Sequence, residues 1–397
     1  MGKRQTFVSV GDILMECQCE AGFLFDRVRE EIQSADVALG QLETVLTDRG
    51  IPTYVDPFCT QLKGGALEYA RDIRRTGFDV VTLCSNHCWD LGRPGVEDTI
   101  AACDENGLLH TGAGMDLAEA SLPAIMEKDG VRYGFLGYNC TGPTGSWAQV
   151  DKPGCNYVHS VTAFEYAVPC IGAIPARYSF PLEDDVCRMQ GQIAELREQV
   201  DVLSVSIHKG VGFIPAAVSP HESAIAHAAI DAGADIVFGH HGHILKGVEV
   251  YKGKAIFHDL GNFLALGAMN GVPFFRYGSK KEHRVQNNYT LEQKIAREKE
   301  FNRRNGGPFI FGPLGTPSPW PPAEIIYTII AKCTVEDGRI TGVGYIPCVF
   351  DDDGYVNILR RSDSRAEELF TYMENITRAA YFDTGYEWDG DEVKILL

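Results

Sequence analysis

Three histidines within four residues, His240, His241 and His243, form the densest group of potential metal ligands in this chain. Buried together, they would repel one another on protonation, and exposed on a sheet edge they would contribute little to packing. Neutral imidazole is the commonest metal ligand in proteins. The group therefore predicts metal ligation, and the alternative is a set of hydrogen-bonded structural histidines.

Further polar residues follow short apolar runs that have the pattern of β-strands. Asp12 and Glu43 follow the first two runs, Asn86 and His87 follow the third, and His208 follows the fourth. In open α/β sheets, binding sites form beyond the carboxyl ends of the strands. Each residue alone would more often be part of a turn or a structural hydrogen bond, but their joint occurrence indicates one site. Oxygen and imidazole ligands suit one or two divalent ions such as Zn, Mn or Fe.

The elements that must position these residues alternate along the first 265 residues, as in βαβ units around a sheet. We expect strands at Phe7–Val10, Val37–Leu39, Val80–Leu83, Tyr133–Tyr138, Val202–Ile207, Ile236–Phe238 and Lys254–Asp259. Between these strands, the pattern predicts helices at Gly65–Thr76, Gly95–Asn106, Glu183–Gln199 and His221–Ala232. The alternation therefore predicts an α/β fold.

Two long segments interrupt this alternation. Asn139–Phe180 is rich in Gly, Pro and aromatic residues and is expected to form an irregular excursion. Gly267–Pro322 combines a charged run with Gly- and Pro-rich pieces. Long loops in compact domains are usually functional covers or disorder, and the aromatic residues favour packed covers over surface decoration.

The C-terminal part is expected to add strands to the same body. Ala323–Cys333 and Ile340–Phe350 flank the turn Glu336-Asp337-Gly338 and predict a hairpin, and Ser362–Ala379 predicts a closing helix. We therefore divide the chain into a core at 1–265, an insertion or lid at 266–322, and strands and a helix at 323–397 that complete the core.

The composition restricts the partners of such a protein. The 397 residues carry 36 Lys and Arg against 54 Asp and Glu, a net charge of −18, with 45% hydrophobic residues. These values describe a folded soluble protein and argue against nucleic acid or an anionic membrane as the partner, since both need a basic surface. A small anionic substrate is compatible if its pocket is locally positive or holds metal. A homo-oligomer is also compatible.

The twelve cysteines are scattered, without the paired spacing of zinc fingers. No apolar stretch of signal-peptide or membrane-spanning length precedes the first strand. We therefore expect reduced, mostly buried thiols in a cytoplasmic protein. Cys17 and Cys19 lie near Asp12 in the sequence and are expected to be core or strand residues, with metal ligation as the alternative.

Taken in order, the motifs resemble the CapA family (poly-γ-glutamate synthesis protein type), a branch of the calcineurin-like metallophosphoesterases. The resemblance covers residues 7–265. It rests on Val10-Gly11-Asp12-Ile13-Leu14-Met15, Gln41-Leu42-Glu43, Ser85-Asn86-His87-Cys88-Trp89-Asp90-Leu91-Gly92, His110-Thr111-Gly112-Ala113-Gly114, Ile207-His208-Lys209-Gly210, Asp231-Ala232-Gly233-Ala234-Asp235, Gly239-His240-His241-Gly242-His243 and Leu260-Gly261-Asn262-Phe263.

The resemblance implies a four-layer α/ββ/α sandwich with a divalent-metal centre at the strand ends. It assigns metal binding to Asp12, Glu43, Asn86, His208, His241 and His243. Glu43 takes the place of the bridging carboxylate. His87 matches the histidine that protonates a leaving group or stabilises the transition state, and Asp90 is expected to orient it.

The chain also departs from the family pattern. Leu14 stands where the wider superfamily has a histidine, so the site is either mononuclear or completed by His240. Lys209 replaces the usual Trp after His208, and we expect it to contact an anionic substrate. Arg93, at the start of a helix, is a second expected anion contact, with an ordinary surface arginine as the alternative.

Three functions are compatible with these residues. The first is a soluble metal-dependent hydrolase that uses metal-bound hydroxide on a small anionic phosphoester or on an amide such as a γ-glutamyl bond. The second is a component of poly-γ-glutamate capsule synthesis or export, working within a complex. The third is a non-catalytic protein that metal stabilises. His87 beside the ligands favours catalysis, because a structural site has no need of it.

Overall fold

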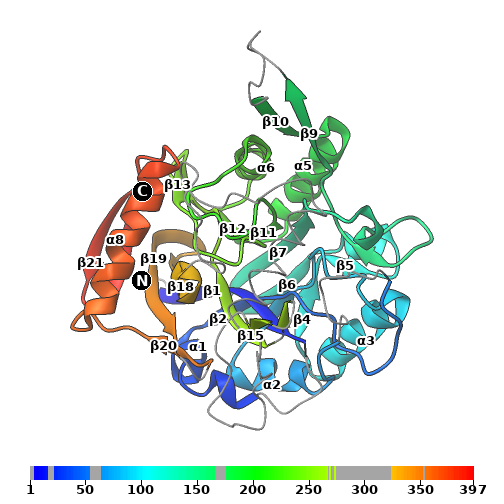
Figure 1. Cartoon of the computed structure of the whole chain (residues 1–397), viewed down its shortest axis with the longest axis horizontal. Helices are drawn as coiled ribbons and strands as arrows, with labels where there is room; N and C mark the ends of the chain where they lie inside the picture. Colours follow the sequence, from blue (N-terminus) through cyan, green and yellow to red (C-terminus); the bar gives the residue numbers. More distant parts are fainter. Residues whose placement is uncertain are drawn as a thin grey trace, which may run out of the picture.

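The computed structural model describes residues 4–16, 22–53, 64–165, 176–266, 268–269, 272–273, 323–351 and 354–397. Within this part of the chain, two β-sheets pack face to face and helices cover the outer face of each sheet (Figure 1). The predicted α/β class and the α/ββ/α sandwich are therefore confirmed.

The larger sheet has ten strands in the order β21-β22-β19-β18-β1-β2-β3-β4, with β15 paired to β1 and β20 paired to β19. Strands β1 to β4 are parallel, so their carboxyl ends meet at one edge. The strands are β1 (Arg4–Met15), β2 (Val37–Leu42), β3 (Val80–Thr82), β4 (Leu109–Thr111), β15 (Asn262–Leu266), β18 (Tyr327–Glu336), β19 (Arg339–Phe350), β20 (Val356–Ile358), β21 (Gly385–Asp389) and β22 (Glu392–Leu396).

The smaller sheet has six strands in the order β13-β14-β12-β11-β7-β6. Its central strands β7, β11, β12 and β14 are parallel, and β6 and β13 run antiparallel at the two edges. The strands are β6 (Ala124–Lys128), β7 (Val131–Asn139), β11 (Val202–His208), β12 (Ile236–His240), β13 (Val248–Tyr251) and β14 (Lys254–Phe257).

Three apolar clusters separate the layers. Phe7 of β1 meets Phe135 and Phe238 of the smaller sheet edge-to-face, which marks the core between the sheets. The outer face of the larger sheet packs on α1 (Arg29–Ser34), α2 (Tyr69–Thr76) and α3 (Gly92–Glu105). The outer face of the smaller sheet packs on α5 (Glu183–Arg197) and α6 (Pro220–Asp231).

Strand β1 changes partners at the point where the site begins. Residues Arg4–Val10 pair with β18, and from Asp12 onward the same edge of β1 pairs with β15. The register shifts on either side of Asp12, and the Asp12 N–H donates to Gly261 O at 2.9 Å. A Cβ on Gly11 would overlap this carbonyl, so the close approach of the two strands requires glycine.

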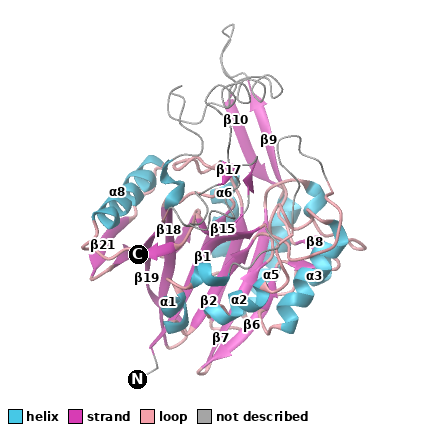
Figure 2. Cartoon of the chain, turned by 60° about the horizontal axis from the view of Figure 1, so that its bottom comes forward, coloured by secondary structure: helices cyan, strands magenta, loops and turns pink. Residues whose placement is uncertain are grey.

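The segment predicted as irregular contains regular structure, so that prediction was wrong in part. After β8 (Gly154–Cys155), which pairs with β5 (Ala113–Gly114), the chain forms a hairpin of β9 (Ser160–Glu165) and β10 (Ala176–Pro181). The hairpin projects from the body beside α6 (Figure 2). The alternation of apolar and polar residues in both strands was its sequence signal.

Most of the predicted insertion at 267–322 lies outside the described residues, as do Cys17 and Cys19. Only the backbone of β16 (Ala268–Met269) and β17 (Val272–Pro273) is described there. The remaining elements are α4 (Leu117–Ala120), α8 (Ser364–Ala379) and the 3-10 turns η1 (Gly22–Phe25), η2 (Thr144–Ser146) and η3 (Ala323–Ile326).

The C-terminal elements lie against the same body. Strand β18 pairs with β1 and β19 pairs with β18. Helix α8 packs its buried face, which includes Leu369 and Met373, into the core between the sheets (Figure 1).

Candidate metal centre

The carboxyl ends of strands from both sheets bring carboxylates and imidazoles to one buried location. Asp12 lies on β1, Glu43 follows β2, and His208 ends β11. The turn after β12 contributes His241 and His243. Because the two sheets pack face to face, ligands from strands far apart in the sequence converge between the two strand edges.

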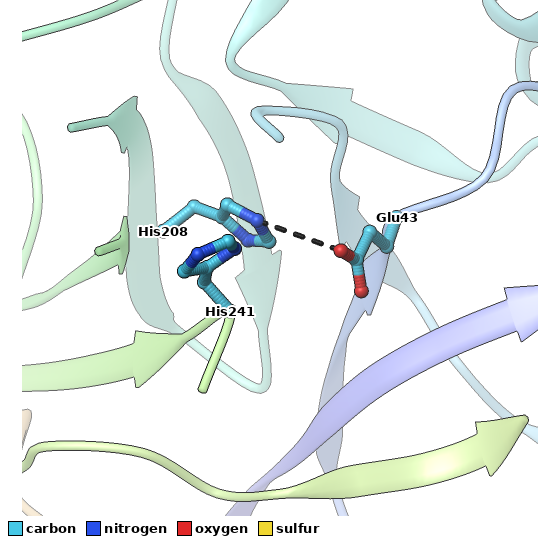
Figure 3. A group of neighbouring side chains, drawn as sticks. All are labelled: Glu43, His208 and His241. Carbon is cyan, nitrogen blue, oxygen red and sulfur yellow. Dashed lines mark ion pairs between the residues drawn. The ribbon is translucent and has the colours of Figure 1, made fainter. Parts of the chain in front are cut away.

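Two ligand groups of three residues each form at this location. In the first, atoms of Glu43, His208 and His241 all lie within 4.8 Å of one another (Figure 3). In the second, atoms of Asp12, Glu43 and His243 satisfy the same limit. Ligands around one transition-metal ion lie about 2.0–2.2 Å from it, so donor atoms at these separations can share an ion after small movements. Glu43 belongs to both groups.

The ligand turn has an unusual backbone. His241 has φ 87° and His243 has φ 53°, a region that residues other than glycine rarely occupy. Hydrogen bonds hold the turn in place: the His241 N–H donates to Asp12 Oδ2 at 3.1 Å, and the Gly242 N–H donates to Asp259 Oδ2. Such conformations persist where the surroundings enforce them, and they cluster at functional sites.

Many donor atoms of these residues have no hydrogen-bond partner among the described residues. They are Asp12 Oδ1, both carboxylate oxygens of Glu43, His208 Nδ1, both ring nitrogens of His240 and His241 Nδ1. Leaving a buried polar atom unpaired costs about 1–3 kcal/mol, and buried polar groups in native proteins are nearly always satisfied. A divalent cation would satisfy several of them at once, so the donor set fits a metal ion.

Burial sets the protonation of the ligand residues. Burial and then the neighbouring imidazoles hold the pKa of His208 well below its usual value. Burial and then His243 lower the pKa of His241 to about 3. Burial and then the Asp12 carboxylate raise the pKa of Glu43 well above its usual value. The imidazoles are therefore neutral near pH 7, which is the form that binds metal.

His87 differs from the ligand histidines. Its Nδ1 lies 2.6 Å from Asp90 Oδ2, and its Nε2 lies 3.8 Å from Glu43 Oε1. Burial opposes protonation, but Asp90 and then Glu43 outweigh this effect and raise the pKa of His87 to about 10. The raised pKa favours the protonated ring, and Nε2 faces the ligand groups. The structure thus brings His87, Asp90 and Glu43 together, and the roles of His87 as an acid and of Asp90 as its orienting carboxylate stay predictions.

Asn86 and His240 lie beside the ligands. Asn86 Oδ1 is 2.7 Å from His208 Nε2. His240 Nδ1 is 3.3 Å from Asp12 Oδ1, and His240 belongs to neither three-residue group. Leu14, which stands where the superfamily has a histidine, is buried in the apolar core.

The structure contradicts the predicted role of Lys209 as a substrate contact. Its side chain is 0% exposed, and its ammonium group donates to Glu222 Oε2 at 3.2 Å. A buried cation that is already paired is inaccessible to a substrate. Arg93 is exposed at the start of α3, with Nη1 3.4 Å from Glu97 Oε1, and its contact with an anion stays a prediction.

Two residues near the ligands escaped the sequence analysis. Asn262 Oδ1 lies 2.9 Å from His243 Nδ1, so it orients that ring. Asp259 accepts hydrogen bonds from the Gly242 and Gly261 N–H groups and so fixes both turns. Both follow strand β14, and the motif Leu260-Gly261-Asn262-Phe263 was the signal that could have identified Asn262.

Comparison with known proteins agrees with these motifs. Residues 6–266 match the family model "Bacterial capsule synthesis protein PGA_cap". One curated relative is "Capsule biosynthesis protein CapA" of Bacillus anthracis, which is 27% identical over an alignment of 273 residues that covers 66% of this chain and 60% of the relative. The chain therefore spans less than two thirds of the length of that relative.

Two solved structures also resemble the chain. One is a novel phosphatase of Mycoplasma pneumoniae, with a TM-score of 0.47 and 14% identity, covering 89% of this chain and 96% of that one. The other is the calcineurin-like phosphoesterase YfkN of Bacillus subtilis, with a TM-score of 0.39 and 12% identity, covering 96% and 100%. Among the described residues, every helix is too short or too polar to cross a membrane.

Proposed function

The chain belongs to the bacterial capsule synthesis protein PGA_cap family, and we propose that it is a divalent-metal-dependent hydrolase acting on a small anionic substrate. The observation that carries this proposal is the pair of ligand groups that share Glu43, whose carboxylate oxygens have no hydrogen-bond partner among the described residues. A purely structural site closes all its ligand positions, whereas a hydrolytic site keeps some open.

Asp12, Glu43, His208, His241 and His243 would hold the divalent ions, and Glu43 belongs to both ligand groups. Asn86 is a sixth ligand through its amide oxygen, and His240 supports Asp12. A bound divalent ion supplies Lewis-acid polarisation of the scissile bond and makes a coordinated water more acidic. Zn, Mn and Fe all suit this mixture of oxygen and imidazole donors.

His87 is the proposed general acid. Asp90 accepts from the Nδ1–H of His87, so it is the doubly protonated ring that carries a second, transferable proton on Nε2, facing the site. Donation of this proton neutralises the negative charge that develops on a leaving oxygen or nitrogen. The Asp90 carboxylate then stabilises the ring in the correct orientation during transfer. These roles of His87 and Asp90 suit the hydrolysis of a phosphoester and of an amide equally. Experiment must therefore decide which type of bond is cleaved.

A second function comes from the family rather than from the site. Relatives named for capsule biosynthesis favour participation in polymer synthesis or export, within a complex. On that alternative the metal centre would bind a γ-glutamyl polymer without turning it over. A metal-stabilised protein without catalysis is the third candidate, and the protonated His87 beside the ligands argues against it.

The test is a hydrolysis screen with the full chain loaded with Mn²⁺ or Zn²⁺. We expect turnover of at least one class among phosphomonoesters, phosphodiesters and γ-glutamyl amides, and we expect a chelator to abolish it. Re-addition of the ion should restore the rate. Metal-loaded protein that binds γ-glutamyl peptides but turns over none of these substrates would favour the accessory function instead.

A further inference from the structure

Directly behind the ligands, three charged side chains are completely buried. Lys209, Lys246 and Glu222 each have 0% exposed side chains. Lys209 follows the ligand His208, and Lys246 lies three residues after His243. Burying an ion without compensation costs several kcal/mol, so an arrangement of three requires an explanation.

One carboxylate serves both lysines. Glu222 Oε2 lies 3.2 Å from Lys209 Nζ and 3.5 Å from Lys246 Nζ. The Lys209 ammonium also lies 3.0 Å from His258 Nδ1 and 3.2 Å from the His258 carbonyl, which gives it three partners. Lys246 Nζ, in contrast, makes no hydrogen bond among the described residues, so the Glu222 charge is its nearest compensation.

The second carboxylate oxygen of Glu222 connects the three buried residues, Lys209, Lys246 and Glu222, to helix α6. Glu222 Oε1 accepts from the Ser219 N–H at 2.8 Å, and the two residues form a capping box at the start of α6. Glu222 therefore links the N-terminus of α6 with two ligand-bearing segments: the end of β11 at His208 and the turn after β12.

The trio packs directly against the backbone beside the ligands. A Cβ on Gly210 would overlap the Glu222 carboxylate, and Gly210 has φ 96°. A Cβ on Gly242, between the ligands His241 and His243, would overlap the Asp259 carboxylate and approach Lys246 Cε at 3.1 Å. Each ligand segment therefore has a glycine at its contact with the buried charged side chains. If these side chains move, the backbone that carries the ligand histidines must move with them.

We infer that Glu222 is a positioning residue of the metal centre. It is the shared counterion of Lys209 and Lys246, and through them it holds the end of β11, which carries His208, at the correct distance from the turn that carries His241 and His243. At that distance the histidines can bind the same metal centre. This inference rests on the proposed function only in that the site holds a metal ion. It also explains why Lys209 stands where a substrate contact was predicted.

The change Glu222→Gln tests the role of the charge. Glutamine preserves the size of the side chain and the capping box, but it leaves two unneutralised ammonium groups facing each other. Their repulsion separates the two ligand segments. We expect the dissociation constant for Mn²⁺, measured by the EPR signal of the free ion, to rise about 10- to 100-fold.

Asp235→Asn is the matched control. Asp235 also bridges two cations, with Oδ2 2.6 Å from Arg197 Nη1 and Oδ1 3.3 Å from Lys254 Nζ. It precedes β12, at the opposite end from His240 and about 16 Å away along the strand. The control should lose thermal stability while its Mn²⁺ affinity stays within about twofold of the wild type.

A double variant, Glu222→Gln with Lys246→Met, separates positioning from general destabilisation. The double variant restores the net charge of Lys209, Lys246 and Glu222 taken together, and it removes the repulsion between the two ammonium groups. We therefore expect it to fold, and we expect its Mn²⁺ affinity to be at least about tenfold higher than that of Glu222→Gln. Equal Mn²⁺ affinity in Glu222→Gln and wild type overturns the inference and leaves the proposed function intact. A double variant that fails to fold, or that binds no better than Glu222→Gln, also overturns it. Wild-type protein that binds no Mn²⁺ overturns both.

Discussion

Glu43 shows why this site has the composition of a metal centre. Its carboxylate is buried, lies near Asp12 and has no hydrogen-bond partner among the described residues. Without a cation, burial and the Asp12 charge raise the pKa of Glu43 and make its ionised form expensive. A divalent ion reverses this balance, because it supplies positive charge to both carboxylates. Binding of a metal ion, as proposed, would therefore stabilise the ionised form of Glu43.

The change His87→Gln separates metal binding from catalysis. Glutamine keeps polarity and size but cannot carry the transferable proton. We expect kcat on any substrate found in the screen to fall about 10²- to 10⁴-fold with metal content unchanged. The control is His110→Gln, since His110 also faces a carboxylate, at 3.2 Å from Asp104, but lies outside both ligand groups. Turnover by His87→Gln at the wild-type rate would remove its catalytic role.

The sequence predicted which residues the structure brings together better than it predicted their surroundings. Asp12, Glu43, His208, His241 and His243 carry a signal because each follows a short apolar run in the sequence, and the structure gathers them into two groups that could hold metal. Lys209 carries the same signal, yet it is buried against Glu222, which is thirteen residues away and on another element. Whether a lysine faces solvent or a buried carboxylate depends on tertiary packing, and strand-end position contains no information about it.

At the scale of elements, the close contact of β1 with the turn before β15 positions Asp12. The two segments approach so closely at Gly11 and Gly261 that a side chain at position 11 has no room. The contact brings the Asp12 N–H to Gly261 O, and the same turn leads to Asn262, which orients His243. Two ligands from opposite halves of the fold are therefore aligned through one backbone contact.

Gly11→Ala should consequently damage both stability and the site. We expect the free energy of unfolding, measured by urea titration, to fall by about 2–3 kcal/mol, because the new methyl group meets backbone that cannot rotate away. Gly191→Ala is the control, since Gly191 is exposed within α5 and a Cβ there meets nothing within 4 Å. It should gain about 0.5–1 kcal/mol. A Gly11→Ala protein as stable as wild type would refute the close-contact argument.

The strands and helices of the core lie close to the predicted ranges, because the spacing of apolar residues in these segments reflects which side chains are buried. The central parallel strands β11 and β12 are buried on both faces, and α5 buries Met189, Ile193 and Leu196 at helical spacing. The edge hairpins were missed. Asp129-Gly130 joins β6 to β7, Lys252-Gly253 joins β13 to β14, and all four residues have positive φ. Asp-Gly is a known hairpin signal, whereas Lys-Gly is not, so only the turn at Asp129-Gly130 had a clear signal in the sequence.

At the scale of the whole molecule, the charge of −18 works against an anionic substrate. Lys209 and Lys246 share the single Glu222 carboxylate, and both are completely buried, so neither can contact a substrate directly. On the proposed function, the attraction of an anionic substrate would come from the metal ions and from His87, whose raised pKa favours its protonated form. Repulsion from distant surface carboxylates is screened beyond about 8 Å at physiological salt, so a local cationic centre is sufficient.

The sandwich itself explains why the ligands are so dispersed in the sequence. Asp12 and Glu43 come from the larger sheet, whereas His208, His241 and His243 come from the smaller one. A metal ion at this place joins the two sheets at their carboxyl ends. Metal binding should therefore depend on ligands of both sheets, and loss of either set should be enough to abolish it.

The most direct test of this account is the number of metal ions per chain, measured by mass spectrometry on protein that has been loaded with Mn²⁺ or Zn²⁺ and freed of excess ion. We predict two ions per wild-type chain, since Glu43 is shared by two ligand groups, and at most one in His241→Ala. A wild-type chain that retains no more ion than a variant lacking both Asp12 and His241 would contradict the account.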